Sequence, residues 1–120
     1  MLTLYGLKNC DRCRSTIKWL NENEMAFEFL DIRSDPPTKN QIKKWVNVHS
    51  IDTILNKKST TWRQLSQKLK DNINSNLERT LSEFPTLIKR PFWEVNFKPK
   101  SELVPGFLED HKKYLKNLNK

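Results

Sequence analysis

The first 32 residues place one amphipathic helix pattern between two short β-prone runs, and this arrangement constrains the fold most. Residues 2–5 are a short β-prone run, and residues 27–32 alternate apolar and polar side chains. Between them, four side chains recur at steps of three, four and three along one face of a helix that begins at Cys10: Cys10, Cys13, Ile17 and Leu20. A β-α-β crossover favours two parallel strands.

The rest of the chain adds a helical middle and a second strand-containing half. Residues 38–84 carry helix patterns, with Thr38 suited to cap the first helix and Pro85 suited to stop the last. Strands are expected at residues 86–88 continuing into 92–95 and at 102–104, before a closing helix at 108–118. The order βαβ, helices, ββα predicts an α/β protein with a thioredoxin-like fold, a mixed sheet and a helical insertion between the two halves. We expect one domain over residues 1–120, with the insert at about 38–84.

Cys10 and Cys13 are the two cysteines, and they form a C-x-x-C pair. A structural zinc site needs four ligands, whereas the histidines, His49 and His111, stand far apart and in no ligand spacing, so we expect no metal. A C-x-x-C pair that opens a helix after a strand has another use. The helix N-terminus and nearby cations stabilise a thiolate over a thiol and lower its pKa.

Cys10 is therefore the predicted nucleophile, with a buried structural thiol as the alternative. Cys13 lies on the apolar stripe, so it is either a small buried hydrophobe or a resolving thiol for a mixed disulfide at Cys10. Arg14 follows Cys10 by one helical turn and is either a thiolate partner or an exposed helix residue. Asn9 is a polar residue at the helix entry, and we place it with Arg14 in the predicted anion-binding set.

Three separated motifs give the sequence a resemblance to a known family. They are residues 4–11 (LYGLKNCD), residues 60–65 (TTWRQL) and residues 88–91 (IKRP). In this order they resemble the arsenate-reductase-like (ArsC/Spx) family, and most closely its YffB-like branch of small reductase-like proteins. The resemblance extends from residue 1 to about residue 114, with residues 104–107 (VPGF) near the short segment that precedes the last helix of that family.

The resemblance implies roles for individual residues. Cys10 matches the family's nucleophilic cysteine, which attacks arsenate in the arsenate reductases and is thought to serve glutathione-dependent thiol reduction in the YffB-like relatives. Arg90 matches the arginine that holds an oxyanion or stabilises the thiolate, and its planar fork of donors suits that role. Pro91 matches the proline whose peptide bond is cis beside the active site.

Two departures from the family pattern bear on the substrate. Arsenate reductases of this family use three arginines around the anion, but Asn56 or Lys57 stands where another arginine aligns, and Lys98 or Lys100 stands where the third does. Lysine is a point charge without bidentate geometry, which argues against arsenate as the substrate. Lys57 and Pro91 nevertheless belong, with Asn9 and Arg14, to the predicted anion-binding set. Cys13 is the second departure, because a C-x-x-C pair is typical of the Spx-type regulators.

The sequence thus predicts a thiol-dependent oxidoreductase, a glutathione-dependent thiol/disulfide reductase with Cys10 as nucleophile. It needs no bound cofactor, because glutathione is its co-substrate and its partner is a small thiol or disulfide. The alternative is an Spx-like redox-sensing regulator that binds RNA polymerase through a Cys10–Cys13 switch. A family member without turnover is a third reading that the sequence leaves open.

The net charge of +8 first suggests a nucleic-acid partner, but its distribution does not favour one. Half of that excess comes from residues at the end of the chain: Lys112, Lys113, Lys116 and Lys120. Lysines near a helix C-terminus have an ordinary electrostatic explanation, and no stripe of aromatic and cationic side chains marks a nucleic-acid groove. With neither a membrane span nor a signal-peptide pattern, we expect a cytoplasmic monomer that binds neither nucleic acid nor membrane.

Overall fold

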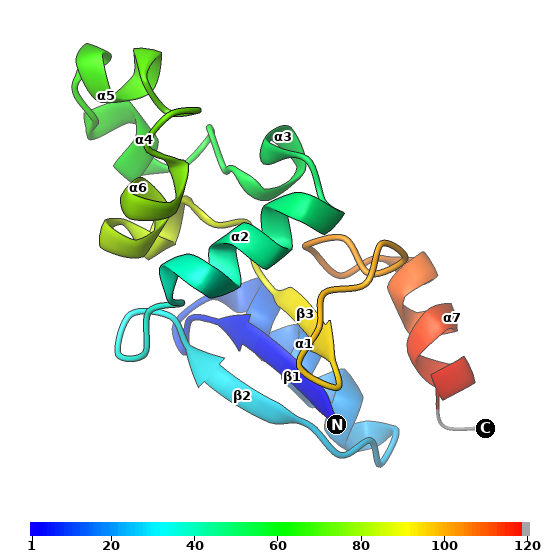
Figure 1. Cartoon of the computed structure of the whole chain (residues 1–120). Helices are drawn as coiled ribbons and strands as arrows, with labels where there is room; N and C mark the ends of the chain where they lie inside the picture. The colour runs from blue at the N-terminus through cyan, green and yellow to red at the C-terminus, as the bar shows by residue number, and fades with distance from the viewer. Residues whose placement is uncertain (119–120) are drawn as a thin grey trace.

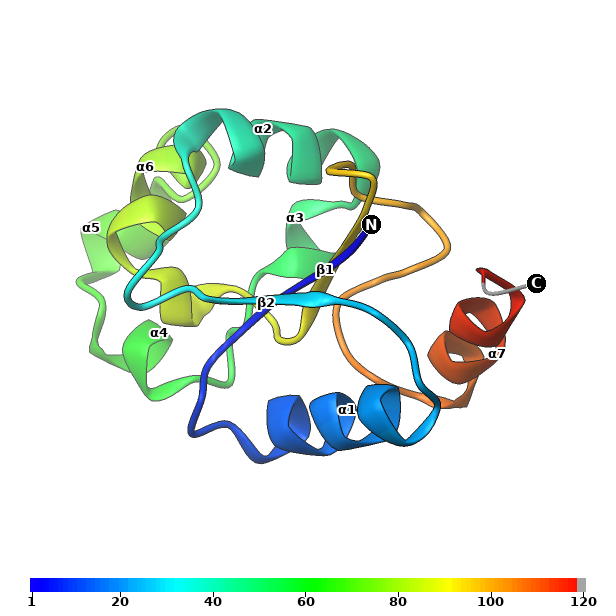
Figure 2. The same ribbon diagram turned by 90° about the horizontal axis from the view of Figure 1, so that it is seen from below.

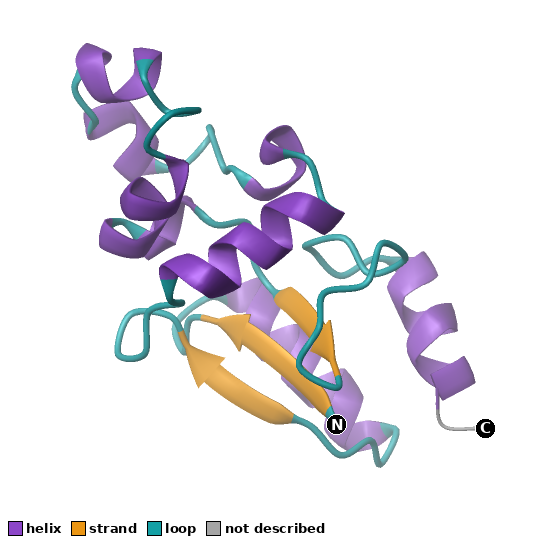
Figure 3. Cartoon of the chain, in the orientation of Figure 1, coloured by secondary structure: helices purple, strands orange, loops and turns teal. Residues whose placement is uncertain are grey.

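The computed structural model describes residues 1–118, and its centre is a three-stranded mixed sheet (Figures 1 and 3). The strands are β1 (Leu2–Gly6), β2 (Glu28–Asp31) and β3 (Phe92–Val95), in the order β2-β1-β3. β1 is parallel to β2, with Thr3 opposite Glu28, and antiparallel to β3, with Thr3 opposite Glu94. The predicted βαβ unit with parallel strands is confirmed.

Helix α1 (Asp11–Glu22) crosses one face of the sheet, and helix α2 (Lys39–Val48) covers the other (Figure 2). Cys13 and Leu20 are fully buried on α1, as the predicted stripe requires. At the start of α2, Thr38 accepts a hydrogen bond from the Gln41 backbone N–H while the Gln41 side chain accepts one from the Thr38 backbone N–H. This reciprocal cap confirms the predicted start of the insert.

The sheet separates two hydrophobic clusters because neighbouring side chains of a strand point to opposite faces. Leu2 and Leu4 of β1 pack with Leu20 of α1 and with Trp93, on the side of α1 and α7 (Glu109–Leu118). Tyr5 belongs to the other cluster, which includes Ile42 and Trp45 of α2, as well as residues of the insert. His49 follows the last turn of α2 but is buried, not at the surface. Its ring contacts Phe92 of this second cluster edge to face at 5.6 Å.

After α2 the insert has four short helices: α3 (Ile51–Ile54), α4 (Thr60–Gln64), α5 (Gln67–Asp71) and α6 (Leu77–Glu83). The stretches at 38–55 and 62–69 that the apolar spacing indicates as single helices are each divided in two, whereas α6 matches the helix indicated at 77–84. The serines Ser50, Ser59 and Ser66 each precede a helix and accept a backbone N–H from its first turn. Ser50 and Ser66 therefore start new helices where periodicity alone continues the old one, and Ser59 starts α4 after the polar loop.

The second half forms one strand where the sequence pattern predicts two, and this prediction is corrected. Residues 86–88 belong mostly to a 3₁₀ turn, η1 (Pro85–Leu87), and Ile88 forms only an isolated antiparallel bridge with Leu55. Residues 102–104 form a turn in which the Leu103 N–H donates to Lys100 O at 3.0 Å. Prolines 99 and 105 flank this segment and lack the N–H groups that a ladder needs.

The last helix of the described residues is α7 (Glu109–Leu118), which lies close to the predicted closing helix. Lys112, Lys113 and Lys116 are on α7, whereas Lys120 lies outside the described residues. Across residues 1–118, no helix has both the length and the apolar character needed to cross a bilayer.

Candidate active site

Cys10 is the residue immediately before α1, and the loop after β1 fixes its backbone. Its N–H donates to Leu7 O at 3.2 Å, and its carbonyl accepts from the Arg14 N–H at 3.0 Å as the first bond of the helix. The sequence reaches this geometry because the β-prone run stops at Gly6 and the helix stripe begins four residues later. The thiol is half-buried at the positive end of the helix.

The surroundings of Cys10 favour its thiolate. Burial favours the neutral thiol, but the backbone N–H of Cys13, the Cys13 thiol and the Arg90 guanidinium outweigh it and lower the pKa of Cys10 below its ordinary value. The Cys10 side chain does not complete a cap hydrogen bond with the helix, so the Cys13 N–H acts by lying close to the sulfur. Cys10 therefore has the environment of a reactive cysteine.

Cys13 is a buried thiol behind Cys10. It is fully buried, and burial, followed by the neighbouring Cys10, raises the pKa of Cys13 to about 11. Its sulfur occupies the space above Gly6, where a Cβ atom would lie 2.5 Å from Cys13 Sγ. Gly6 thus permits the close approach of α1 to β1 at the point where the site is built.

Arg90 reaches Cys10 from the opposite half of the chain. Its Nη1 donates to Thr86 O at 2.9 Å and to Ile88 O at 3.2 Å, which fixes the plane of the guanidinium. Its Nε is buried and has no hydrogen-bond partner among residues 1–118. The peptide bond between Arg90 and Pro91 is cis, as the family resemblance implied.

Cys10 and Arg90 face an open cleft of about 1010 Å³, here called the Cys10 cleft. Its walls come from the start of α1, the segment from α3 to residue 58, residues 89–90 and the loop before α7. The charged lining residues are Asp11, Arg12, Asp52, Lys57, Lys58, Lys89 and Arg90. Cationic side chains outnumber carboxylates in this set, so the cleft attracts anions.

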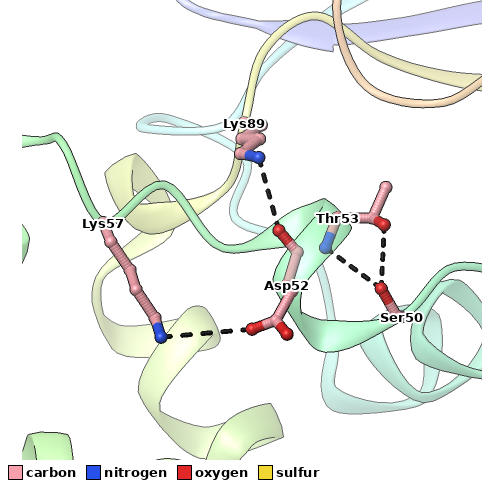
Figure 4. Close-up of polar contacts among 5 residues, drawn as sticks. All are labelled: Ser50, Asp52, Thr53, Lys57 and Lys89. Atoms are coloured by element: carbon pink, nitrogen blue, oxygen red, sulfur yellow. Dashed lines mark hydrogen bonds and ion pairs between the residues drawn. The ribbon is translucent and has the colours of Figure 1, made fainter.

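Asp52 organises part of this cationic wall (Figure 4). Its carboxylate lies 4.0 Å from Lys57 Nζ, and its backbone carbonyl accepts a hydrogen bond from Lys89 Nζ at 3.3 Å. Ser50 caps this short helix by accepting the Thr53 N–H at 3.2 Å, which fixes the turn that carries Asp52. Because the Asp52 and Lys57 side chains are mostly exposed, their ion pair is weak and both groups can turn to a ligand.

The structure brings only some of the predicted site residues together. Cys10, Lys57 and Arg90 line the Cys10 cleft, and so does Asn56, the alternative to Lys57. Cys13 lies behind Cys10, and Pro91 is buried beside Arg90. Asn9 is exposed and is not part of the lining, and Arg14 also lies outside it, paired with the Asp11 carboxylate. The predicted roles of these two residues remain predictions.

Sequence reasoning missed Lys58, Lys89, Arg12 and Asp52 in the lining of the Cys10 cleft. Lys58 and Lys89 are next to Lys57 and Arg90 in the sequence, so their positions could have indicated that they line the cleft. Asp52 had no such signal, because it reaches the cleft through the bridge between Leu55 and Ile88. Among residues 1–118, no three His, Cys, Asp or Glu side chains cluster in a way that could hold a metal ion.

The amino-acid sequence is similar to those of several known proteins. The model of the ArsC family matches residues 5–111. An uncharacterized protein of Haemophilus influenzae is 37% identical over 92 residues, which cover 76% of this chain and 81% of that protein. The global transcriptional regulator Spx of Bacillus subtilis is 30% identical over 93 residues, which cover 76% of this chain and 71% of the regulator.

A solved structure described as the YFFB (PA3664) protein is similar to this chain along almost its whole length. The two share 27% sequence identity with a TM-score of 0.84, and the match covers 96% of this chain and 98% of the other. The α/β architecture, with its mixed three-stranded sheet and helical insertion, is therefore that of the ArsC thioredoxin-like structures.

Proposed function

Because the chain belongs to the ArsC family, which includes arsenate reductases, we propose that it is a glutathione-dependent thiol/disulfide reductase with Cys10 as its nucleophile. One observation carries the proposal. Cys10 faces an anion-attracting cleft at the start of a helix, with the Cys13 N–H and Arg90 favouring its thiolate. A thiolate in a positively charged cleft suits attack on a disulfide whose other half is anionic.

The reaction proceeds by two thiol–disulfide exchanges. In the first, the Cys10 thiolate attacks the glutathione sulfur of a mixed disulfide, the S–S bond breaks, and the substrate leaves as a thiolate that takes a proton from water. Cys10 is then joined to glutathione. In the second, a glutathione thiolate attacks that disulfide, oxidised glutathione leaves, and the Cys10 thiolate is restored. Arg90 and the N-terminus of α1 stabilise the negative charge on the Cys10 sulfur at both ends of the cycle.

The second exchange is assigned to glutathione from solution, not to Cys13. Burial raises the pKa of Cys13 to about 11, so very little of it is thiolate at neutral pH. Glutathione carries carboxylates as well as an ammonium group. The lysines of the Cys10 cleft suit the carboxylates, and the exposed Asp52 suits the ammonium group.

Arsenate is not the proposed substrate. Apart from Arg90 and Arg12, the cations of the Cys10 cleft are Lys57, Lys58 and Lys89, which hold an anion without bidentate geometry. This set suits carboxylates spread along a flexible ligand better than one compact tetrahedral oxyanion.

The test is turnover of a small disulfide in the presence of glutathione, followed through glutathione reductase and NADPH. We expect Cys10→Ser to abolish turnover and Cys13→Ser to retain most of it. Loss of turnover in both variants would instead assign the second exchange to Cys13. A wild-type rate no faster than glutathione alone would reject the reductase function.

A second candidate is a redox-sensing regulator, and the 30% identity to the Bacillus subtilis regulator favours it. In this case Cys10 and Cys13 form a disulfide under oxidation and change the affinity for RNA polymerase. Purified RNA polymerase should then bind the reduced and the oxidised protein with different affinities, and Cys13→Ser should remove the difference.

A further inference from the structure

Residues 60–63 (TTWR) are a sequence motif that the proposed chemistry does not use. They lie on α4, in the insert, and none of them lines the Cys10 cleft. Two of them nevertheless contact lining residues. The Lys57 ammonium lies 5.7 Å from the centre of the Trp62 ring, and Arg63 Nη2 donates to Lys58 O at 3.3 Å.

The third contact of this motif leads toward Arg90. The hydroxyl groups of Thr61 and Thr86 are hydrogen-bonded at 2.6 Å, across 25 positions of the chain. The same Thr86 offers its backbone carbonyl to Arg90 Nη1 at 2.9 Å. Thr86 therefore links α4 to the guanidinium that acts on Cys10, through its hydroxyl on one side and its backbone carbonyl on the other.

Thr86 needs such support because it lies in a single 3₁₀ turn. η1 is three residues long and has backbone bonds from the N–H groups of Leu87 and Ile88, both 3.0 Å. Neither of these bonds uses the Thr86 carbonyl, so its direction depends on how the turn is held. Short 3₁₀ segments have poor hydrogen-bond geometry, and a side-chain bond from a packed helix restricts them.

We propose that Thr61 is a positioning residue, whose hydroxyl fixes Thr86 so that the Thr86 carbonyl holds the Arg90 guanidinium beside Cys10. The role rests on the proposed function of Cys10 and Arg90. It gives the insert a part in the thiol chemistry, although the insert supplies none of the reacting atoms. Thr61 acts on Arg90 orientation, and Arg90 acts on the thiolate.

The competing explanation is that Thr61 only stabilises the insert. The two explanations differ in what a Thr61→Val variant does to Cys10, because valine keeps the shape of threonine and removes the hydroxyl. If Thr61 only stabilises the insert, Thr61→Val lowers the melting temperature and leaves the reactivity of Cys10 in the folded protein unchanged. If Thr61 positions Arg90, Thr61→Val changes the reactivity of Cys10 while the protein is still fully folded.

The experiment measures the rate of Cys10 alkylation by iodoacetamide against pH, on folded protein, with the modified residue identified by peptide mass. Arg90→Gln should slow alkylation about tenfold at a fixed pH below the midpoint. Thr61→Val should slow it about threefold and move the midpoint to higher pH, because part of the Arg90 effect is lost. Thr61→Ser keeps the hydroxyl and should restore the wild-type rate.

Thr60→Val is the matched control. Thr60 is the neighbouring threonine of the same motif, is exposed, and has no side-chain hydrogen bond within residues 1–118, so its substitution should change nothing. Thr86→Val removes the other half of the bond and should repeat the Thr61→Val result. It also provides the test if Thr61→Val does not fold.

The outcomes separate the two proposals. If Cys10 is alkylated at the wild-type rate in Thr61→Val and Thr86→Val but slowly in Arg90→Gln, the positioning role of Thr61 is wrong and the role of Arg90 stands. If Thr61→Val still slows alkylation threefold in the Arg90→Gln background, Thr61 does not act through Arg90, and the proposal also fails. If Arg90→Gln itself alkylates like the wild type, the premise taken from the proposed function fails instead.

Discussion

Two polar regions of the molecule, the cluster around Glu94 and the Cys10 cleft, differ in how completely their groups are paired. Glu94 is buried on β3, where one carboxylate oxygen accepts from the Tyr5 hydroxyl at 2.6 Å and the other from Trp45 Nε1 at 2.9 Å. Gln41 in turn donates to the Tyr5 oxygen at 3.2 Å. In this cluster every acceptor atom of the carboxylate has a donor from the protein itself.

The Cys10 cleft has the opposite character. Its cations outnumber its carboxylates, and Arg90 Nε has no partner within residues 1–118. A polar cluster that pairs all its groups internally holds the sheet and α2 together, whereas one that leaves donors open has capacity for a ligand. The first cluster therefore stabilises the sheet, and the second has open groups that suit the proposed chemistry.

The largest expected effect follows from breaking the paired cluster. Glu94→Gln replaces one acceptor oxygen by a donor that faces Tyr5 or Trp45, and we expect it to lower the free energy of unfolding by about 2–4 kcal/mol. Urea denaturation measures this change. Cys10 alkylation in the folded variant should not change.

Thr3→Val is the control on the opposite strand. Thr3 lies across from Glu94, and its hydroxyl is buried without a hydrogen-bond partner within residues 1–118. Its removal should leave stability equal or higher, because no bond is lost. If Glu94→Gln is no less stable than Thr3→Val, the Glu94 cluster does not hold the sheet.

The next effect separates charge from geometry at Arg90. Arg90→Lys keeps the positive charge but cannot bond both backbone carbonyls and still face Cys10. We expect Arg90→Lys to slow Cys10 alkylation about threefold, between the wild type and the tenfold slower Arg90→Gln. A lysine variant as fast as the wild type would show that the charge alone is sufficient.

A smaller effect concerns substrate charge. Lys58→Gln should lower kcat/KM about threefold for an anionic disulfide and leave a neutral disulfide unchanged, whereas Asp52→Asn should raise it about twofold. Both effects should shrink at high ionic strength. Lys18→Gln is the control, because Lys18 pairs with Glu22 on α1 outside the Cys10 cleft. Equal responses to both disulfides would contradict electrostatic selection.

The smallest effect is a pH dependence of stability from His49. Burial lowers the pKa of His49, so the folded state favours the neutral ring while the unfolded chain protonates it near pH 6.5. Because the unfolded state then binds more protons, stability falls as pH drops below that value. Between pH 7 and pH 5, the wild type should therefore lose more stability than His49→Phe in urea denaturation. Parallel curves for the two proteins would contradict this.

Sequence reasoning predicted the Cys10 half of the site because its signals are local. A short strand, a loop and a helix stripe place Cys10 at a helix start without reference to the rest of the chain. Arg90 and Pro91 depended on the resemblance to a family, since no periodicity connects residue 90 to residue 10. Lys57 was placed in the same way.

The remaining features depend on contacts that periodicity does not encode. Asp52 and Lys89 meet because Leu55 and Ile88 form a bridge between the insert and the second half. The predicted strand at residues 102–104 failed for a related reason. Leu103 is apolar and fully buried, as a strand residue is, but it is buried from a turn between two prolines.

The bridge between Leu55 and Ile88 has a consequence for amide hydrogen exchange. The Asn56 N–H donates to Leu87 O at 2.7 Å, and the Lys89 N–H donates to Ile54 O at 2.8 Å. Both amides can exchange with solvent only when the segments that carry Lys57 and Arg90 move apart. Their protection therefore measures the free energy of opening one wall of the Cys10 cleft, and a ligand that spans Lys57 and Arg90 should slow the exchange of these two amides together.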